Sequence, residues 1–367
     1  MVRQAHHGVS LVPLGPGYCA DAQFWDDKFM SERILTVEDL RVDLPVPAGT
    51  LHAVQGVSFH VDRGETVCIV GESGCGKTLT ALAIMDLLPV RAKRTAKRLE
   101  LAGRDMLNLS EREMSDIRGA RAAMIFQEPM TSLNPAYTIG NQLEEALLRH
   151  NRVSRRQARE RAVYLLERVG ITAAGSRLKQ YPHQLSGGLR QRVMIAMALM
   201  CAPAMILADE PTTALDVTIQ AQILHLLAEL QREFSMGLVL ITHDLGVVAR
   251  IATRVVVMYA GEVVETGTAA EIFSNPAHPY TRGLIACIPV PGRTRRGQPL
   301  GTIPGMVPSL VGEQIGCHFA GRCSYVIDPC RRSPVPLDTV LGDSHLVRCI
   351  RHADIAPGAV LATGAAS

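Results

Sequence analysis

The sequence is poor in aromatic residues and has no long apolar segment. Phe, Trp and Tyr make up 4% of its 367 residues, and Trp25 is the single tryptophan. The longest apolar run, Val193 to Ala208, is shorter than the roughly 20 residues that cross a bilayer, and Pro203 interrupts it. The first residues lack the basic start and apolar core of a secretory signal. We therefore expect a chain that neither spans a membrane nor is secreted.

A strong charge imbalance is also lacking. The 38 basic and 35 acidic residues give a net charge of +3, so the composition carries no global signature of nucleic-acid binding. The cysteines number nine, and an odd count without a signal favours a reducing cytosol over a disulfide framework. The length and a hydrophobic content of 47% fit two globular domains, or one with additions.

The most informative stretch fits the phosphate-binding P-loop pattern G-x-x-x-x-G-K-[ST]. It consists of Gly71, Glu72, Ser73, Gly74, Cys75, Gly76, Lys77 and Thr78. Residues 65–70 before it predict a buried strand, and residues 79–88 after it predict a helix ended by Pro89. Glycines let backbone amides close around phosphate oxygens. Lys77 is expected to reach the β- and γ-phosphates, and Thr78 to offer its hydroxyl group to Mg²⁺.

The regions around this loop differ in pattern. Strands are predicted at 34–37, 40–44, 52–61 and 66–70, which suggests a small antiparallel sheet that helps to cover the nucleotide. Residues 139–171 predict helices, with a capping box that starts at Ser154 and a buried face of Leu165, Leu166 and Val169. Arginines at 149, 152, 155, 156, 159 and 161 are expected to form a solvated face, with contact to lipid head groups as the alternative.

Polar side chains follow three predicted buried strands. Asp209 and Glu210 end the strand that begins at residue 205. Asp209 is expected to hold Mg²⁺ through water, and Glu210 to orient or deprotonate the attacking water. Gln127 ends another strand and can reach the metal or the water. His243 faces the ligand edge of an open α/β sheet, where it can contact the γ-phosphate.

A second anion cradle is predicted at residues 185–191, Leu-Ser-Gly-Gly-Leu-Arg-Gln. Ser186, Gly187 and Gly188 stand at the start of a predicted helix over 193–200, where backbone amides can face an anion. This signal alone is weak.

Together the motifs resemble those of the ATP-binding subunit of an ABC transporter. The P-loop, Gln127, residues 185–188, Asp209 and Glu210, residues 214–216 and His243 stand in that family's order and spacing over about residues 34–275. The resemblance implies an α/β fold, with a P-loop ABC ATPase core, an N-terminal antiparallel β subdomain, a helical subdomain at about 128–190 and a small C-terminal extension. The expected divisions are an N-terminal extension at 1–29 that is disordered, a nucleotide-binding domain at 30–275 and the C-terminal extension at 276–367.

The resemblance also implies site residues and a head-to-tail dimer. ATP is sandwiched between the P-loop of one subunit and the signature of the other, here Ser186, Gly187, Gly188 and Gln191. Glu210, His243 and Gln127 take the catalytic positions, and Thr78, Gln127 and Asp209 those around Mg²⁺. The family's adenine-stacking aromatic residue is replaced by Leu44, which leaves the adenine contact to apolar packing by Leu44 or Val46.

The tail resembles that of oligopeptide, dipeptide and nickel importers. Residues 275–282 match the start of their C-terminal extension, and residues 127–135 match the same group. Cys317, Cys323, Cys330 and Cys349 follow in a C-x₅-C-x₆-C-x₁₈-C spacing, without the C-x₂-C of common zinc sites. The resemblance implies a [4Fe–4S] cluster on these cysteines; zinc or four free thiols are the alternatives. The tail is expected to lie far from the P-loop and to share no residues with it.

The sequence is therefore interpreted as the ATPase subunit of a peptide-importing ABC transporter, peripheral to the cytoplasmic face of the inner membrane. The implied partners are two permease subunits, a second ATPase subunit that forms a heterodimer with this chain and, indirectly, an extracytoplasmic solute-binding protein, with no nucleic acid. Import of nickel or of another small solute is one alternative. A soluble ABC ATPase of translation or DNA repair is another, although a second P-loop or a second Ser-Gly-Gly signature is absent from the sequence. A third is a redox sensor in which the cysteines gate the ATPase.

Overall fold

The computed structural model describes residues 33–128, 132–213, 215–288, 301–341 and 344–355. The expected extension at 1–29 lies outside these residues. So do positions 129–131 of the segment after Gln127, and Ala214.

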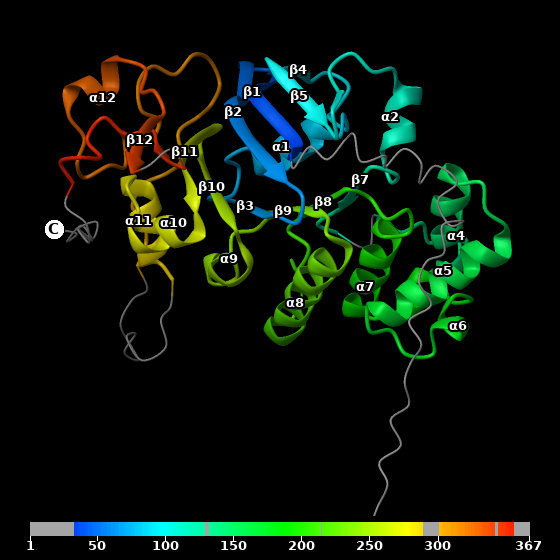
Figure 1. Cartoon of the computed structure of the whole chain (residues 1–367). Helices are drawn as coiled ribbons and strands as arrows, with labels where there is room; N and C mark the ends of the chain where they lie inside the picture. Colours follow the sequence, from blue (N-terminus) through cyan, green and yellow to red (C-terminus); the bar gives the residue numbers. More distant parts are fainter. Residues whose placement is uncertain (1–32, 129–131, 214, 289–300, 342–343, 356–367) are drawn as a thin grey trace, which may run out of the picture.

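Two β-sheets form the frame of the molecule (Figure 1). The smaller sheet is antiparallel and consists of β1 (Arg33–Val46), β2 (Gly49–Asp62), β4 (Lys93–Thr95), β5 (Arg98–Leu101) and β6 (Arg104–Asp105). The larger sheet has the order β12 (Asp338–Leu341), β13 (His345–Val347), β11 (Glu262–Thr268), β10 (Arg254–Tyr259), β3 (Thr66–Val70), β9 (Gly237–Ile241), β8 (Met205–Asp209) and β7 (Ala122–Ile125). From β10 to β7 the strands are parallel. This α/β architecture confirms the predicted fold class.

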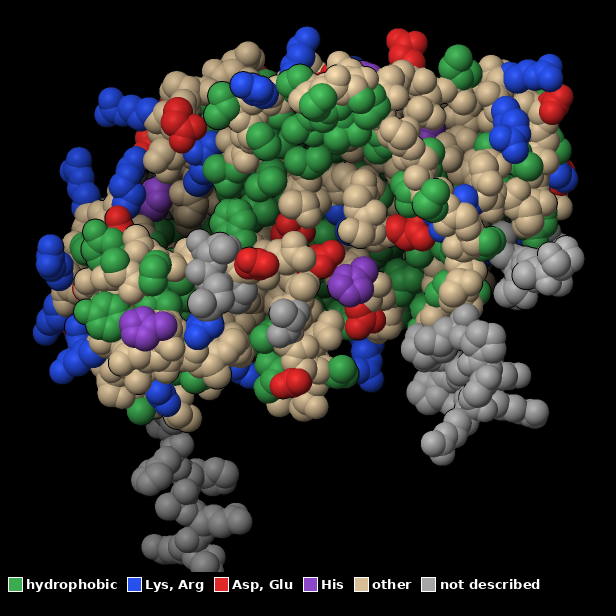
Figure 2. Space-filling model, turned by 180° about the vertical axis from the view of Figure 1, so that it is seen from behind, with side chains coloured by type: hydrophobic (Ala, Val, Ile, Leu, Met, Phe, Trp, Pro, Cys, Tyr) green, Lys and Arg blue, Asp and Glu red, His purple; other side chains and the backbone are tan. Residues whose placement is uncertain are grey.

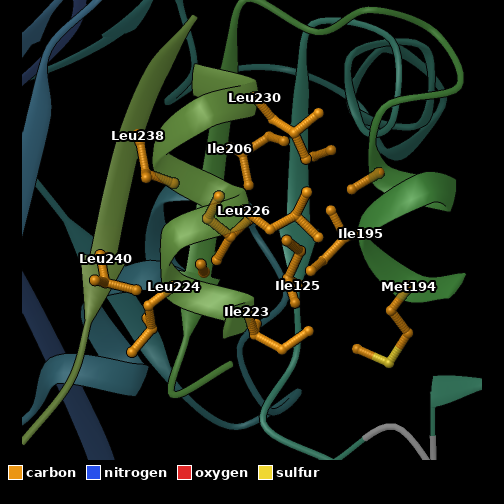
Figure 3. Packing of buried hydrophobic residues seen from close by; sticks show 14 of the residues in the cluster. Ile125, Met194, Ile195, Ile206, Ile223, Leu224, Leu226, Leu230, Leu238 and Leu240 are labelled. Carbon is orange, nitrogen blue, oxygen red and sulfur yellow. The ribbon is translucent and has the colours of Figure 1, made fainter. Parts of the chain in front are cut away.

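The parallel strands separate two hydrophobic clusters by simple alternation. In β8, Ile206 and Ala208 face one cluster, whereas Met205 and Leu207 face the other. Successive side chains of a strand point to opposite faces, so a strand that is buried on both sides is apolar throughout. One face packs against the long helix α8 (Val217–Phe234) and against α7 (Gly187–Ala198), as Figure 3 shows. The other face is covered by the smaller sheet and by α1 (Lys77–Ile84).

The N-terminal strands differ in two respects from the prediction. Residues 66–70 form β3, which lies in the larger sheet, parallel to β9 and β10, and not in the small antiparallel sheet. Residues 34–37 and 40–44 are parts of one strand, β1, whose pairing with β2 shifts in register between Val37 and Leu40. Asp39 has a φ of 51° there, and its carboxylate accepts hydrogen bonds from Arg41. The polar Glu38–Asp39 pair thus marks a bulge, which the sequence pattern could not distinguish from a turn.

The helix after the P-loop is shorter than predicted. α1 ends at Ile84 rather than at residue 88, because Asp86 adopts a φ of 53° and the Leu87 amide turns back to the Leu82 carbonyl. A left-handed residue ends the helix before Pro89 does.

The predicted helical segment forms a separate lobe. It contains α4 (Ile139–His150), α5 (Arg155–Arg168), α6 (Ala174–Arg177) and the 3₁₀ turn η3 (Pro182–Gln184). The Ser154 capping box is present, and Leu165, Leu166 and Val169 are fully buried. Lys and Arg side chains gather along this edge of the molecule in Figure 2, at its left. α2 (Glu111–Ile117) lies between this lobe and the smaller sheet.

Arg161 is an exception to the predicted solvated face. Its side chain is buried, donates to the Leu199 carbonyl, and lies over the rings of Tyr164 and Phe234. The stem and guanidinium of arginine pack well on aromatic surfaces, which explains why this position is turned inward.

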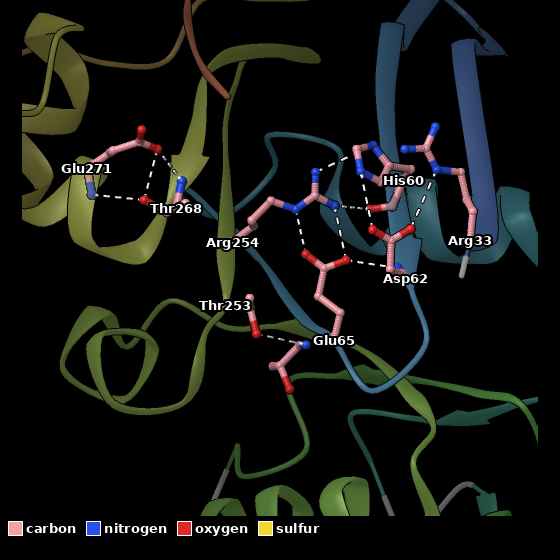
Figure 4. Close-up of polar contacts among 9 residues, drawn as sticks. Arg33, His60, Asp62, Glu65, Thr253, Arg254, Thr268 and Glu271 are labelled. Atoms are coloured by element: carbon pink, nitrogen blue, oxygen red, sulfur yellow. Dashed lines mark hydrogen bonds and ion pairs between the residues drawn. The ribbon is translucent and has the colours of Figure 1, made fainter. Parts of the chain in front are cut away.

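A polar network connects the two sheets near the start of β3 (Figure 4). Arg254 at the start of β10 donates to the Glu65 carboxylate and to the His60 carbonyl. Glu65 also accepts from the Asp62 amide, and Asp62 pairs with Arg33. These contacts fix the turn that leads into β3.

The C-terminal residues extend the core sheet. β13 pairs with β11, and α9 (Leu245–Ile251), α10 (Ala269–Ser274) and α11 (Pro279–Ala286) pack beside them, followed by α12 (Asp328–Arg332). Glu265 of β11 is fully buried and accepts hydrogen bonds from the amides of Ala277 and His278 and contacts His345 Nε2 at 2.8 Å. This carboxylate therefore joins three segments that are distant in sequence.

Candidate nucleotide-binding site

The P-loop follows β3 and begins α1, and two of its glycines are required by close backbone contacts. Gly71 has a φ of 151°, and a Cβ atom there would lie 2.1 Å from the Met258 carbonyl oxygen. Gly76 has a φ of 99°, and its Cβ would lie 2.5 Å from the Ala53 carbonyl oxygen. The loop is thus pressed between β10 and β2 in a conformation that only glycine allows.

Lys77 is buried at the start of α1. Its ammonium group donates to the Gly71 carbonyl at 2.8 Å and to the Glu72 carbonyl at 3.0 Å. The cation is therefore curled over its own loop, where it can face an anion held by the loop amides.

Thr78 and Asp209 meet although 131 positions separate them. The Thr78 hydroxyl donates to Asp209 Oδ1 at 3.1 Å. Burial raises the pKa of Asp209, against the lowering effect of this hydrogen bond. A hydroxyl and a carboxylate side by side are oxygen donors of the kind Mg²⁺ prefers, so the two residues fit the predicted metal.

Glu210 is the centre of the second polar group. Its carboxylate accepts from the Thr213 hydroxyl at 2.9 Å and from the Gln127 amide at 3.3 Å, and lies 3.5 Å from His243 Nδ1. Its backbone has a φ of 43°, and its amide donates to the Ile241 carbonyl. Three of the predicted side chains thus meet at the carboxyl ends of β7, β8 and β9. Thr213 was missed by the sequence analysis because nothing marks a threonine in a loop.

The signature residues lie at the start of α7. Ser186 is the helix N-cap and accepts from the Leu189 amide at 3.4 Å. Gly188 leaves room for Ile219 of α8, whose methyl carbon would lie 3.1 Å from a Cβ atom. Gln191 is predicted to contact the ATP of a partner subunit. Its side chain is buried here, and the residue is 1% exposed. Among the described residues, no hydrogen bond or ion pair joins Ser186, Gly187 or Gly188 to the P-loop of the same chain at 71–78.

Leu44, the predicted adenine contact, is half-buried on β1. It pairs with Leu51 of β2. Two residues after Leu51, the carbonyl oxygen of Ala53 lies close to Gly76 of the P-loop. This position is on the sheet that flanks the P-loop, as predicted.

The C-terminal extension contacts the P-loop directly, so the expectation that the tail lies far from it was wrong. Arg322 forms a double ion pair with Glu72, at 2.6 and 3.0 Å, and the Tyr280 hydroxyl accepts from the Glu72 amide at 2.8 Å. Neither contact has a sequence signal, because 250 positions separate Arg322 from Glu72 and 208 positions separate Tyr280 from it.

The four tail cysteines line one apolar pocket with Phe319, Tyr325 and Val335. Burial raises the pKa of Cys317 to about 12 and that of Cys349 to about 11, which makes these thiols poor nucleophiles and weakens the redox-sensor alternative. In the part of the chain that the structure describes, no three His, Cys, Asp or Glu side chains stand close enough to hold a metal ion.

Comparison with known proteins places these features in a family. Residues 54–213 match the ABC transporter family, and residues 264–330 match the oligopeptide/dipeptide transporter C-terminal region. The dipeptide transport ATP-binding protein DppD of Bacillus subtilis is 52% identical, over 87% of this chain and 94% of its own length. The corresponding Escherichia coli protein is 48% identical, over 86% of this chain and 96% of its own. The chain belongs to the ATP-binding proteins of ABC transporters.

A solved structure agrees with this family. The dimeric ATP-binding cassette MJ0796 bound to ADP and Pi superimposes on this chain with a TM-score of 0.58 and is 29% identical to it. The match covers 64% of this chain and 99% of the MJ0796 chain. The predicted resemblance to ABC ATPases of the oligopeptide and dipeptide group is confirmed, as is the prediction of an ATPase. ABC ATPases of importers work with membrane permease subunits. The described residues contain no helix that is long and apolar enough to cross a membrane.

Proposed function

We propose that this ABC ATPase powers the import of dipeptides or oligopeptides across the cytoplasmic membrane. The supporting observation is that a region typical of oligopeptide and dipeptide transporters, at 264–330, follows the ATPase core in the same chain. We further propose a division into an N-terminal extension at 1–29, a nucleotide-binding domain at 30–275 with its helical subdomain at about 128–190, and a C-terminal extension at 276–367.

The proposed site roles follow the contacts. Residues 71–78 bind the ATP phosphates, with Lys77 as the cation, and Leu44 packs near the adenine. Thr78, Asp209 and Gln127 would hold Mg²⁺, which screens the phosphate charge when bound. Glu210 polarises the attacking water, and Gln127, Thr213 and His243 hold its carboxylate in place. Ser186, Gly187, Gly188 and Gln191 complete the ATP site of a second subunit.

The finer assembly is also a proposal. Two permease subunits and a second, different ATPase subunit form the complex, which a solute-binding protein outside the membrane serves. The chain is peripheral, on the cytoplasmic face. ATP binding favours the closed pair of ATPases and hydrolysis the open pair, which biases the membrane subunits between two states.

The four cysteines are proposed to bind a [4Fe–4S] cluster, with zinc as the alternative. Their convergence on one pocket supports a shared ligand. Zinc requires four sulfurs around one atom, whereas each thiolate of a cubane binds a different corner and the sulfurs stand farther apart.

Solute uptake by the native host tests the proposal. Cells that lack this chain should lose ATP-dependent uptake of a radiolabelled dipeptide or oligopeptide. The wild-type chain should restore uptake, and Glu210→Gln should not. If cells that lack the chain keep peptide uptake, and the wild-type chain instead restores uptake of nickel, the solute is nickel and not a peptide. Unchanged uptake of both solutes would contradict an importer role.

A further inference from the structure

Glu72 is an unusual residue of the P-loop, because its side chain turns away from the loop toward the C-terminal extension. We propose that Arg322 of the extension is a positioning residue: it holds Glu72, and with it the P-loop, in the form that binds ATP. The inference rests on the proposed assignment of residues 71–78 to the phosphates.

The guanidinium group of Arg322 is fully engaged. Nη1 and Nη2 pair with the two Glu72 oxygens, and Nη1 also reaches the Tyr259 hydroxyl at 3.4 Å. Nη2 and Nε donate to the carbonyls of Ile303 and Pro304 at 3.0 and 2.9 Å. The side chain is 5% exposed, so this arginine is built into the extension before it meets the loop. A planar fork held on several sides fixes the carboxylate in one orientation.

The backbone of Glu72 is held from the same direction. Its amide donates to the Tyr280 hydroxyl, and Tyr280 packs with Tyr259 and Phe319 in a buried ring cluster with centroids 4.6 to 5.5 Å apart. Glu72 is therefore anchored at two points, at its amide by Tyr280 of α11 and at its carboxylate by Arg322 of the C-terminal extension.

Two short steps connect this anchor to the chemistry of the P-loop. The Glu72 carbonyl accepts from the Lys77 ammonium at 3.0 Å, so a shift of Glu72 moves an acceptor of the phosphate-facing cation. In addition, Glu72 places a negative charge in a loop that must receive a polyanion, and Arg322 neutralises that charge. Without its partner the carboxylate would repel ATP.

Nucleotide affinity distinguishes this role of Arg322 from that of a merely structural contact. In the full-length chain, Arg322→Ala should weaken the binding of a fluorescent Mg²⁺–ATP analogue by about tenfold, since a charge-assisted bidentate pair is lost. Adding Glu72→Gln to Arg322→Ala should recover most of the affinity, because the unpaired charge is gone. At saturating ATP, hydrolysis by the assembled transporter should stay near the wild-type rate, so that the change appears in KM. Arg322→Lys, which keeps the charge but not the fork, should fall between wild type and Arg322→Ala.

Arg332→Ala is the matched control, because Arg332 lies in α12 of the same extension, is 76% exposed and pairs with Asp328 one helical turn away. It should bind the analogue like the wild type. Equal affinities of Arg322→Ala and the wild type would overturn the inference, as would a double variant no better than Arg322→Ala. If Arg322→Ala does not fold, Arg322→Lys and Glu72→Gln decide the matter by the same titration. Wild-type affinity of Lys77→Ala would instead refute the assignment of the P-loop itself.

Discussion

The Thr78 hydroxyl lies 3.1 Å from the Asp209 carboxylate and donates a hydrogen bond to it. Thr78 lies in the first turn of α1, which follows β3, and Asp209 is the last residue of β8. In the sheet, β9 lies between β3 and β8. The contact therefore fixes the relative position of the phosphate loop and the strand end that carries Glu210. The two adjacent carboxylates have different partners. Asp209 contacts the Thr78 hydroxyl, and Glu210 contacts Gln127, Thr213 and His243.

Replacing Glu210 by Gln should remove turnover and keep ATP binding. The amide cannot accept a proton from the attacking water, whereas the P-loop is unchanged, so we expect hydrolysis to fall about a hundredfold or more. The variant should also trap a closed dimer in ATP. The measurement is phosphate release by the reconstituted transporter, with Glu229→Gln on the exposed face of α8 as control. Near wild-type hydrolysis by Glu210→Gln would contradict the assigned role.

Replacing Lys77 by Ala should weaken nucleotide binding itself. The ammonium group that donates to the Gly71 and Glu72 carbonyls is lost, and with it the cation that we propose binds the β- and γ-phosphates. We expect the dissociation constant of a fluorescent nucleotide to rise about tenfold or more. Lys97→Ala, at an exposed position between β4 and β5, is the control of equal charge change. An unchanged dissociation constant for Lys77→Ala would mean that the loop does not hold the phosphates.

Much of the core could be predicted because its signals are local. The P-loop, the buried strands and the Ser154 capping box each depend on neighbouring residues, and the structure has them where the sequence predicted them. The order of strands brought Gln127, Glu210 and His243 to one edge, as expected of a parallel sheet. Contacts with no local pattern were missed. Arg322 with Glu72, and Arg161 with Phe234, join distant segments through single side chains.

The extension should loosen from the core as the pH falls. Burial lowers the pKa of His278 to about 4, while the nearby Glu265 opposes this effect. Between about pH 6.5 and pH 4 the unfolded chain takes up a proton that the folded chain does not, so stability falls with pH in that window, by at most about 3 kcal/mol. His278→Asn keeps an N-cap acceptor for the Tyr280 amide but cannot titrate.

The measurement is urea unfolding at several pH values. The stability of the wild type should drop more steeply than that of His278→Asn from pH 6.5 to pH 4, and the two should run in parallel above pH 7. Identical slopes in both proteins across the lower window would show that His278 does not carry the effect.

The last prediction concerns the four tail cysteines. Protein purified without oxygen should be brown, with broad absorbance near about 400 nm and about four irons per chain. A colourless protein with about one zinc would support the alternative. Cys323→Ser or Cys330→Ser should lose the metal, and Cys201→Ser, outside the pocket, should keep it. Because Cys323 directly follows Arg322, loss of the metal at Cys323 should also weaken nucleotide binding, which a tail without contact to the P-loop would not do. Elemental analysis together with nucleotide titration separates these outcomes. Neither iron nor zinc above background in the wild type would leave the cysteines as buried thiols, whose raised pKa values already suit that state.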